Sequence, residues 1–224
     1  MISVQEGLDR GFLWVTRPQT VKFFIVVSVF FVVGALSWVG FNQYRTNRER
    51  HAQQALNEVI SLFKGINPGT SAQAVLSWQE LELASRMGYE QNSGSVIAPY
   101  FLALAAHALV QQDKKAEALE LITRVVNQLA ESNSLRDAYR VTQALLIFDT
   151  APERVSEGRD ILKSIASAEH SYYKDQALYW LGVDAELMGD TSQARTYFDQ
   201  LRSFRRRDLP QEYPSPWASL VWSA

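Results

Sequence analysis

The sequence predicts an all-α protein in which one N-terminal transmembrane helix precedes a solenoid of helix pairs. Three observations lead to this fold class. An uncharged, mostly apolar run occupies residues 23–41. No later stretch shows the period-two alternation of a half-buried strand. Instead, segments of roughly 15 residues with apolar side chains three and four positions apart follow one another, separated by short turns.

Residues 23–41, FFIVVSVFFVVGALSWVGF, form the predicted membrane span. A helix rises about 1.5 Å per residue, so this stretch covers roughly 28 Å, close to the roughly 30 Å hydrocarbon core of a bilayer. Its side chains are apolar all round the helix, which a soluble helix with one buried face does not need. Trp14, Lys22 and Trp38 suit the interface between lipid and water.

A cleavable signal peptide is the alternative for the same stretch. Ala35-Leu36-Ser37 is an acceptable cleavage pattern of small residues after an apolar run. The apolar run continues to Phe41, however, and the leading tail is long for a signal peptide, which favours an uncut signal anchor. Charge leaves the orientation open, because three Lys and Arg residues lie near each end of the span.

The polar stretch after the span is expected to continue as a helix and to become amphipathic. Gly65 and the turn Asn67-Pro68-Gly69 end it. Its apolar residues recur at three- and four-residue spacing and form one stripe: Ala52, Ala55, Leu56, Val59, Ile60 and Phe63.

Seven further helices are predicted, and most of their ends have a chemical cause. A capping box at Thr70–Gln73 begins the first of them, a loop at 88–95 follows it, and Gly189 is expected to end a helix in the left-handed conformation. The expected N-caps are Asp113, Ser134, Thr150 and Asp190. The expected helices are 71–87, 96–111, 114–131, 134–148, 153–168, 171–188 and 191–205.

Three helix pairs repeat a pattern of small residues. The clearest pair, Leu181–Leu201, has Gly182 in its first helix and Ala194 in its second. These units resemble the tetratricopeptide repeat, so the resemblance implies a tetratricopeptide-like α-solenoid in which these two small residues meet and allow close packing. An unrelated bundle of helix hairpins is the alternative. Ala106 and Ala118 fill the two places upstream, whereas the middle unit has Gly158 in the second place and Leu146 in the first.

The resemblance also implies a concave face that binds segments of other proteins. Tyrosine, glutamine and small apolar residues dominate the positions that would face it, and charges are few. These positions are Tyr100, Ala103, His107 and Gln111 in the first unit, Arg140, Gln143 and Ile147 in the middle unit, and Gln176, Tyr179, Val183 and Glu186 in the last.

The carboxyl-terminal stretch contains three prolines that forbid a continuous helix. Trp217, Leu220, Val221 and Ala224 lie on one side of a short amphipathic turn, which is expected to cap the apolar end of the solenoid. A detachable interaction peptide is the alternative. The predicted divisions are an N-terminal tail (1–22), the transmembrane helix (23–41), a linker with the first amphipathic helix (42–69), the repeats (70–209) and a Pro-rich tail with a capping helix (210–224).

The sequence shows no constellation of residues that suggests an enzyme. The chain has no Cys, no phosphate-binding loop and no metal-binding motif, and its three histidines stand far apart. The formal net charge is −2, and the residues after the span are mildly acidic. We therefore expect no catalytic residues, cofactor, metal, nucleic acid or small-molecule substrate.

The order of span, linker helix and repeats resembles the ancillary Sec-translocon subunit family. The chain departs from that family in its Pro-Trp tail and in the loop at 88–95. The resemblance implies a single-pass protein of the bacterial inner membrane with a periplasmic C-terminal domain. Its partners would be translocon components, a membrane-anchored chaperone or unfolded clients, besides the lipid bilayer. The alternative is a structural scaffold subunit of a secretion or envelope-assembly complex that binds one fixed partner.

Overall fold

The computed structural model describes residues 18–66, 72–169, 171–204 and 215–221, and before residue 37 it describes only the backbone. The described residues contain eight α-helices and two 3₁₀-helices, joined by turns, and no strand. The all-α prediction is therefore confirmed. The bounds of these helices are α2 Pro18–Gly65, α3 Ala72–Asn92, α4 Ala98–Gln111, α5 Lys115–Gln128, α6 Arg136–Thr150, η1 Pro152–Arg154, α7 Val155–Ser167, α8 Lys174–Leu187, α9 Thr191–Ser203 and η2 Pro216–Leu220.

The chain divides into two compact units, Met1–His51 and Ala52–Ala224. The first unit contains most of α2, where Trp38, Phe41 and Tyr44 are 72%, 60% and 63% exposed. Among the fully described residues, no helix is both long and apolar enough to cross a membrane. Residues 23–36 of the predicted span, together with Trp14 and Lys22, lie outside those residues.

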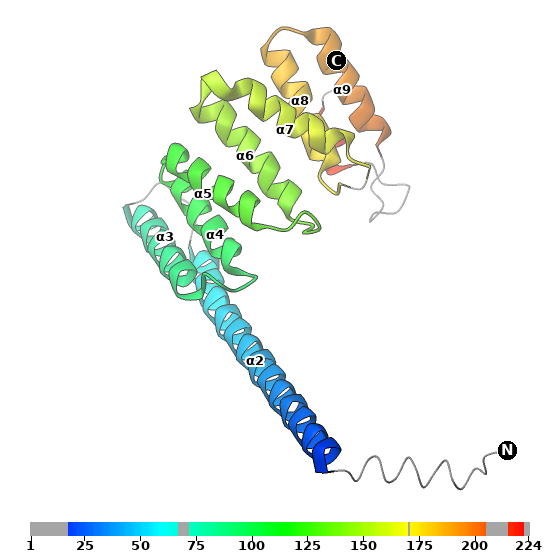
Figure 1. Ribbon diagram of the computed structural model, residues 1–224. Coiled ribbons are helices and arrows are strands. Elements are labelled where there is room, and N and C mark those ends of the chain that lie inside the picture. The colour runs from blue at the N-terminus through cyan, green and yellow to red at the C-terminus, as the bar shows by residue number, and fades with distance from the viewer. Residues whose placement is uncertain (1–17, 67–71, 170, 205–214, 222–224) are drawn as a thin grey trace, which may run out of the picture. The chain divides into compact units, whose positions relative to one another are not determined.

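In the second unit each helix from α3 to α9 packs against its neighbours in the chain. The extensive contacts are α3 on α4, α4 on α5, and so on to α8 on α9 (Figure 1). This one-dimensional pattern is that of a solenoid, in which a helix pair cannot bury its apolar face alone and relies on the next pair. The last turns of α2 belong to the same unit, because Val59 is buried with Trp78, Leu81 and Phe101.

Small residues allow the helices of a pair to approach closely. A Cβ atom on Gly182 of α8 would lie 2.3 Å from Cε1 of Phe198 in α9. The predicted small pair Ala106 and Ala118 is buried in the core between α4 and α5. These contacts explain why the spacing of small residues was informative in the sequence.

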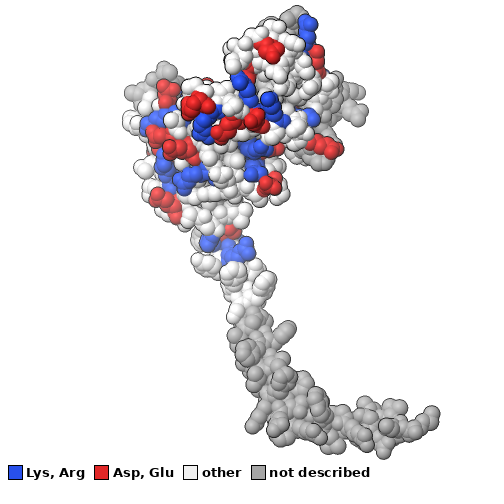
Figure 2. Space-filling model, turned by 45° about the horizontal axis from the view of Figure 1, so that its top comes forward, with Lys and Arg blue, Asp and Glu red and all other residues white. Residues whose placement is uncertain are grey.

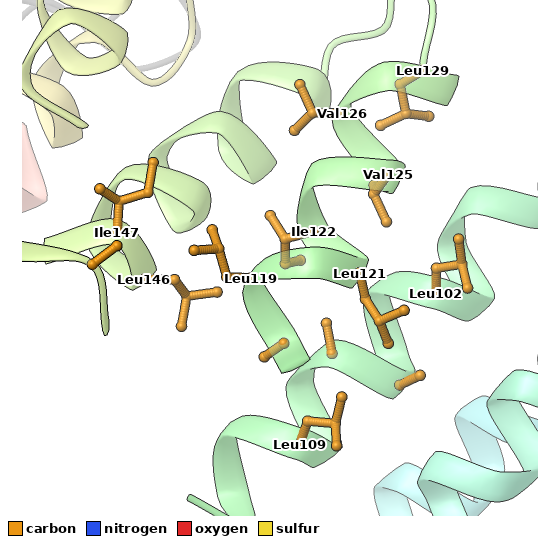
Figure 3. Packing of buried hydrophobic residues seen from close by; sticks show 14 residues of the cluster. Leu102, Leu109, Leu119, Leu121, Ile122, Val125, Val126, Leu129, Leu146 and Ile147 are labelled. Atoms are coloured by element: carbon orange, nitrogen blue, oxygen red, sulfur yellow. The ribbon is translucent and has the colours of Figure 1, made fainter. Parts of the chain in front are cut away.

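The largest buried cluster joins α4, α5 and α6. Figure 3 shows the apolar side chains of α5 between the other two helices, with Leu121 near Leu102 of α4 and Leu119 near Leu146 of α6. Helix α5 therefore has an apolar face wide enough to serve two neighbours, as an internal helix of a solenoid must.

The last turn between helices follows the sequence prediction. Gly189 has a φ of +78°, which ends α8, and the side chain of Asp190 accepts a hydrogen bond from Gln193 N at 2.9 Å. Glycine tolerates this left-handed conformation without steric cost, and the Asp carboxylate satisfies an otherwise unpaired amide of α9.

The other predicted N-caps that lie in the described residues were wrong. Asp113 has a φ of 61° and belongs to the turn, so α5 begins without a side-chain cap. The hydroxyl of Thr150 donates to Leu146 O within α6, and Asn133 rather than Ser134 accepts from the amide of Leu135. The N-cap position lies one residue later than predicted in each case, at Lys114 for α5, Leu135 for α6 and Ala151 for η1, and none of these side chains caps its helix. The predicted capping box includes residues 70 and 71, which lie outside the described residues.

The predicted loop at 88–95 is largely helical, since α3 continues to Asn92. A Cβ atom on Gly88 would lie 2.5 Å from the ring of Phe101. Gly88 therefore acts as a packing position within a helix rather than as the breaker that its sequence context suggests.

Candidate protein-binding groove

An apolar groove of about 710 Å³ lies between the end of α2, α4 and α6 in the second unit. Its size is within the range of roughly 300–1,000 Å³ that ligand sites occupy in proteins. Helices α2, α4 and α6 supply most of its wall, so no single pair of helices forms the groove by itself. The lining residues are Leu56, Ile60 and Phe63 of α2, Tyr100, Ala103, Leu104, Ala106, His107 and Val110 of α4, Ile122 of α5, and Leu135, Tyr139, Thr142, Leu145, Leu146 and Asp149 of α6 and its start.

The groove carries little charge. Among the described residues that line it there is no Lys or Arg, and Asp149 is paired with Lys115, whose Nζ lies 3.0 Å from Oδ2 of Asp149. Burial, with a smaller effect of Tyr100 and Tyr173, raises the pKa of Tyr139 to about 12, so its phenol is uncharged at neutral pH. A mostly apolar wall whose carboxylate is already paired favours apolar side chains over ions.

His107 is the basic side chain of the groove. Its ring packs edge-on against Phe63 and Trp78, with centroid distances of 5.3 and 5.7 Å. Partial burial removes water from the ring and lowers the pKa of His107 below its ordinary value of 6.5. The lowered pKa favours the neutral imidazole near pH 7, which keeps this part of the groove apolar.

The first unit contributes most of its predicted residues. Tyr100, Ala103 and His107 line the groove on α4. Tyr100 is held by Asn133, whose amide donates to the phenol oxygen at 3.0 Å. Gln111 is exposed at the end of α4 and lies outside the lining.

The middle unit has a different register from the predicted one. Gln143 is buried and donates to Thr123 Oγ1 at 3.1 Å, and Ile147 is fully buried in the core. Arg140 bonds Asp137 and Ser164 instead of facing the groove. The residues of α6 that line the groove are Tyr139, Thr142, Leu145, Leu146 and Asp149.

The close contact of Gly158 with α6 also differs from the predicted one. The 3₁₀-helix η1 lies between α6 and α7. A Cβ atom on Gly158 would lie 2.6 Å from Cε1 of Phe148 and 3.2 Å from the carbonyl oxygen of Ala144. Gly158 therefore packs closely against Phe148 and Ala144, and Leu146, which was predicted to be its partner, is not among its three nearest contacts.

The predicted residues of the last unit lie apart from this groove. Tyr179 and Val183 pack against a small cluster formed by Ala185, Ala194 and Phe198, and Val221 of the carboxyl-terminal segment packs against the same cluster. Glu186 is exposed, and the amide of Gln176 donates to Asp175 Oδ1. The structure thus brings together the predicted residues of the first unit but not those of all three.

The wall formed by α2 was missed. Leu56, Ile60 and Phe63 were placed in the apolar stripe of the linker helix, with no role in binding. The stripe is wider than one buried face needs: Ala52 and Val59 are buried, whereas Leu56, Ile60 and Phe63 are only half-buried and line the groove. In the sequence, the width of this stripe could have indicated that α2 forms part of the groove wall.

Charges on the surface of the second unit do not mark another binding face in the view of Figure 2, where Lys and Arg alternate with Asp and Glu over the solenoid. Within the described part of the chain, no group of three or more His, Cys, Asp or Glu residues is placed to hold a metal ion. Comparisons of the chain with family models, characterised proteins and solved structures find no match.

Proposed function

We propose that the protein is a membrane-anchored, non-enzymatic interaction module whose groove holds uncharged, bulky side chains of other polypeptides. The apolar groove between α2, α4 and α6, whose one acidic lining residue is already paired with Lys115, is the observation that carries this proposal. Its volume accommodates several side chains, and its tyrosines offer large contact area with one hydrogen-bonding group each.

The apolar run at residues 23–41 supports the anchoring part of the proposal. Where α2 is described, Trp38 and Tyr44 are exposed, and amphipathic aromatic rings of these two types are enriched at the surface of a bilayer. A tether would raise the effective concentration of the groove near polypeptides at the membrane. The tetratricopeptide-like pattern of small residues, together with the resemblance to ancillary Sec-translocon subunits, favours a periplasmic domain at the bacterial inner membrane that assists translocation or chaperoning.

The sharpest test is site-specific photo-crosslinking in intact membranes. A photoreactive amino acid would replace Thr142, which is exposed within the groove, and, as the matched control, Lys163, which is exposed on α7 outside it. We expect crosslinks to translocon components and to unfolded polypeptides from position 142 only. A single stoichiometric partner would support the scaffold alternative, and equal yields from both positions would contradict a role of the groove.

A charge placed in the groove should weaken the same crosslinks. Leu145→Lys puts an ammonium group on the wall of the groove, four residues before Asp149, where an opposite charge is compatible with the helix. Loss of one apolar contact of about 1.5–3 kcal/mol corresponds to roughly a tenfold lower yield or more. Leu83→Lys, at a side chain that is 61% exposed on α3, is the control and should leave the yield unchanged.

A further inference from the structure

The carboxyl-terminal segment Ser215–Val221 is bound to the surface of α8 through its first residue. Ser215 and Asp175 are both about 1% exposed, and the serine hydroxyl donates to Oδ2 of that carboxylate. The same hydroxyl oxygen accepts a hydrogen bond from the amide of Trp217 at 3.2 Å, which closes the first turn of η2. One hydroxyl thus fixes both the position and the conformation of the segment.

Aromatic contacts hold the middle of the segment. The ring of Trp217 lies 5.2 Å from that of Tyr179 and 6.4 Å from that of Trp180, measured between centroids. Val221 packs with Tyr179 and Val183 against the cluster of Ala185, Ala194 and Phe198. In Figure 1 the short red segment lies beside α8 and α9.

The surface that receives this segment coincides with positions that the repeat pattern assigns to a ligand-binding face. Tyr179 and Val183 are two of the four such positions in the last unit, and Gln176 follows Asp175 directly. The segment itself has the form of a bound peptide: a hydroxyl residue with an extended backbone, Ser215, then a proline and an aromatic anchor. A peptide of the chain therefore occupies the place of a partner.

The segment fills its place only in part. Leu220, which the sequence predicts to be on the covered side, is 51% exposed. The indole N–H of Trp180 is buried without an acceptor among the described residues.

We propose that this face of α8 is a peptide-recognition site whose resident ligand is the chain's own Ser215–Val221 segment. It exchanges that ligand for a segment of another polypeptide in which a hydroxyl residue precedes a Pro-aromatic pair. Asp175 would bind the hydroxyl, Tyr179 and Trp180 the aromatic ring, and Val183 a following aliphatic side chain. The proposal depends neither on the groove between α2, α4 and α6 nor on the membrane anchor.

Tethering sets the scale of the competition. A segment joined by a short linker has an effective concentration on the order of millimolar. A free peptide with a dissociation constant of about 100 μM for the open face would then bind the intact chain roughly tenfold more weakly, because only the open fraction is competent. Exchange therefore requires a partner that binds better or that is itself held nearby.

The test uses a fluorescent peptide with the sequence of residues 211–224, QEYPSPWASLVWSA, and the full chain in detergent micelles. We expect the Trp217→Ala chain to bind this peptide at least tenfold more tightly than the unaltered chain. Peptides with Ala in place of Ser215 or of Trp217 should lose binding. Because these changes are in the peptide, they cannot affect the folding of the chain. A folded Trp217→Ala chain that binds no better than the unaltered one would show a permanent cap instead.

Hydrogen exchange on the unaltered chain keeps the proposal testable if the Trp217→Ala chain fails to fold. The amides of residues 217–221 should exchange much faster than those of the middle of α8, because local release of the segment precedes unfolding of the solenoid. Protection equal to that of α8 would overturn the proposal. Crosslinking from position 142 reports on the groove between α2, α4 and α6, so the two proposals can fail separately.

Discussion

Gly182 occupies a position at which a single methyl group is too large. A Cβ atom there would meet Cε1 of Phe198 at 2.3 Å, whereas one on Gly65 would meet nothing within 4 Å. We expect Gly182→Ala to lower the free energy of unfolding by about 1–3 kcal/mol, since an overpacked core must shift its side chains. Urea unfolding measures this value, with Gly65→Ala as the matched control.

A second substitution tests whether the phenyl ring is the cause. Adding Phe198→Leu to Gly182→Ala removes the ring that the new methyl group would meet. The two changes should therefore cost less together than the sum of their separate costs, because they share one contact. Strict additivity would mean that the glycine is needed for another reason.

His107 should make stability depend on pH in a defined direction. Burial against Phe63 and Trp78 lowers the pKa of His107 below 6.5 in the folded state, so the unfolded chain binds the proton first as the pH falls. The stabilisation is fully present above about pH 6.5 and is lost as the pH falls through the lowered folded pKa. His107→Gln should reduce the difference in unfolding free energy between pH 7.5 and pH 5.5. An unchanged difference would assign the effect to other groups.

These two residues show what single positions reveal in advance. The small residues at 182 and 194 could be recognised because close helix packing requires them at a fixed spacing. The aromatic neighbours of His107 could not, because Phe63 and Trp78 come from α2 and α3, far earlier in the chain. Contacts between distant segments depend on how the helices stack, which local periodicity does not specify.

At the level of helices, an ion pair joins α7 to α8. Arg159 Nε lies 2.6 Å from Oδ2 of Asp184, and a second bond of 3.2 Å runs from Nη2 to Oδ1; both side chains are less than a third exposed. The hydrogen bond to Asp184 raises the pKa of the Arg159 guanidinium above its ordinary value. A bidentate charged pair of this kind is stronger than an ordinary surface pair.

Asp184→Asn should therefore lower the free energy of unfolding by about 1–2 kcal/mol, with a smaller effect at high salt. Asp199→Asn is the control. Its carboxylate lies 3.1 Å from Arg202 within α9, and both of those side chains are well exposed, so a change below about 0.5 kcal/mol is expected. Equal effects would mean that the pair between helices adds nothing beyond surface charge.

The helices themselves were largely predictable, and the turns between them were not. Periodicity located α4, α5, α8 and α9 within a few residues of their ends, because each has one or two continuous apolar faces. The turn from α6 to α7 holds η1, and Gly158 beyond it packs against Phe148 and Ala144 rather than Leu146. Gln143 and Ile147 are buried in α6, whereas Tyr139, Thr142 and Leu145 line the groove, because which side of a helix faces outward depends on how the helices stack.

At the scale of the second unit, the stacking order determines which parts depend on one another. The α4–α5–α6 cluster and the small cluster of α8, α9 and Val221 share no buried residue. Stability in such arrays is approximately the sum of each repeat and its neighbouring interfaces. Damage at one end should therefore remain partly local.

Leu201→Ala tests this expectation at the carboxyl-terminal end of the unit. Leu201 is 0% exposed in α9, so truncation should cost about 2–5 kcal/mol. In hydrogen exchange, α8, α9 and residues 217–221 should lose protection, whereas α4 and α5 should keep most of theirs. Leu109→Ala, at an equally buried side chain of α4, is the matched control and should reverse the pattern.

A uniform loss of protection from α3 to α9 in either variant would show instead that the solenoid unfolds as one cooperative unit. The face of α8 could not then open by itself through loss of its own repeat, and exchange there would require release of the Ser215–Val221 segment alone.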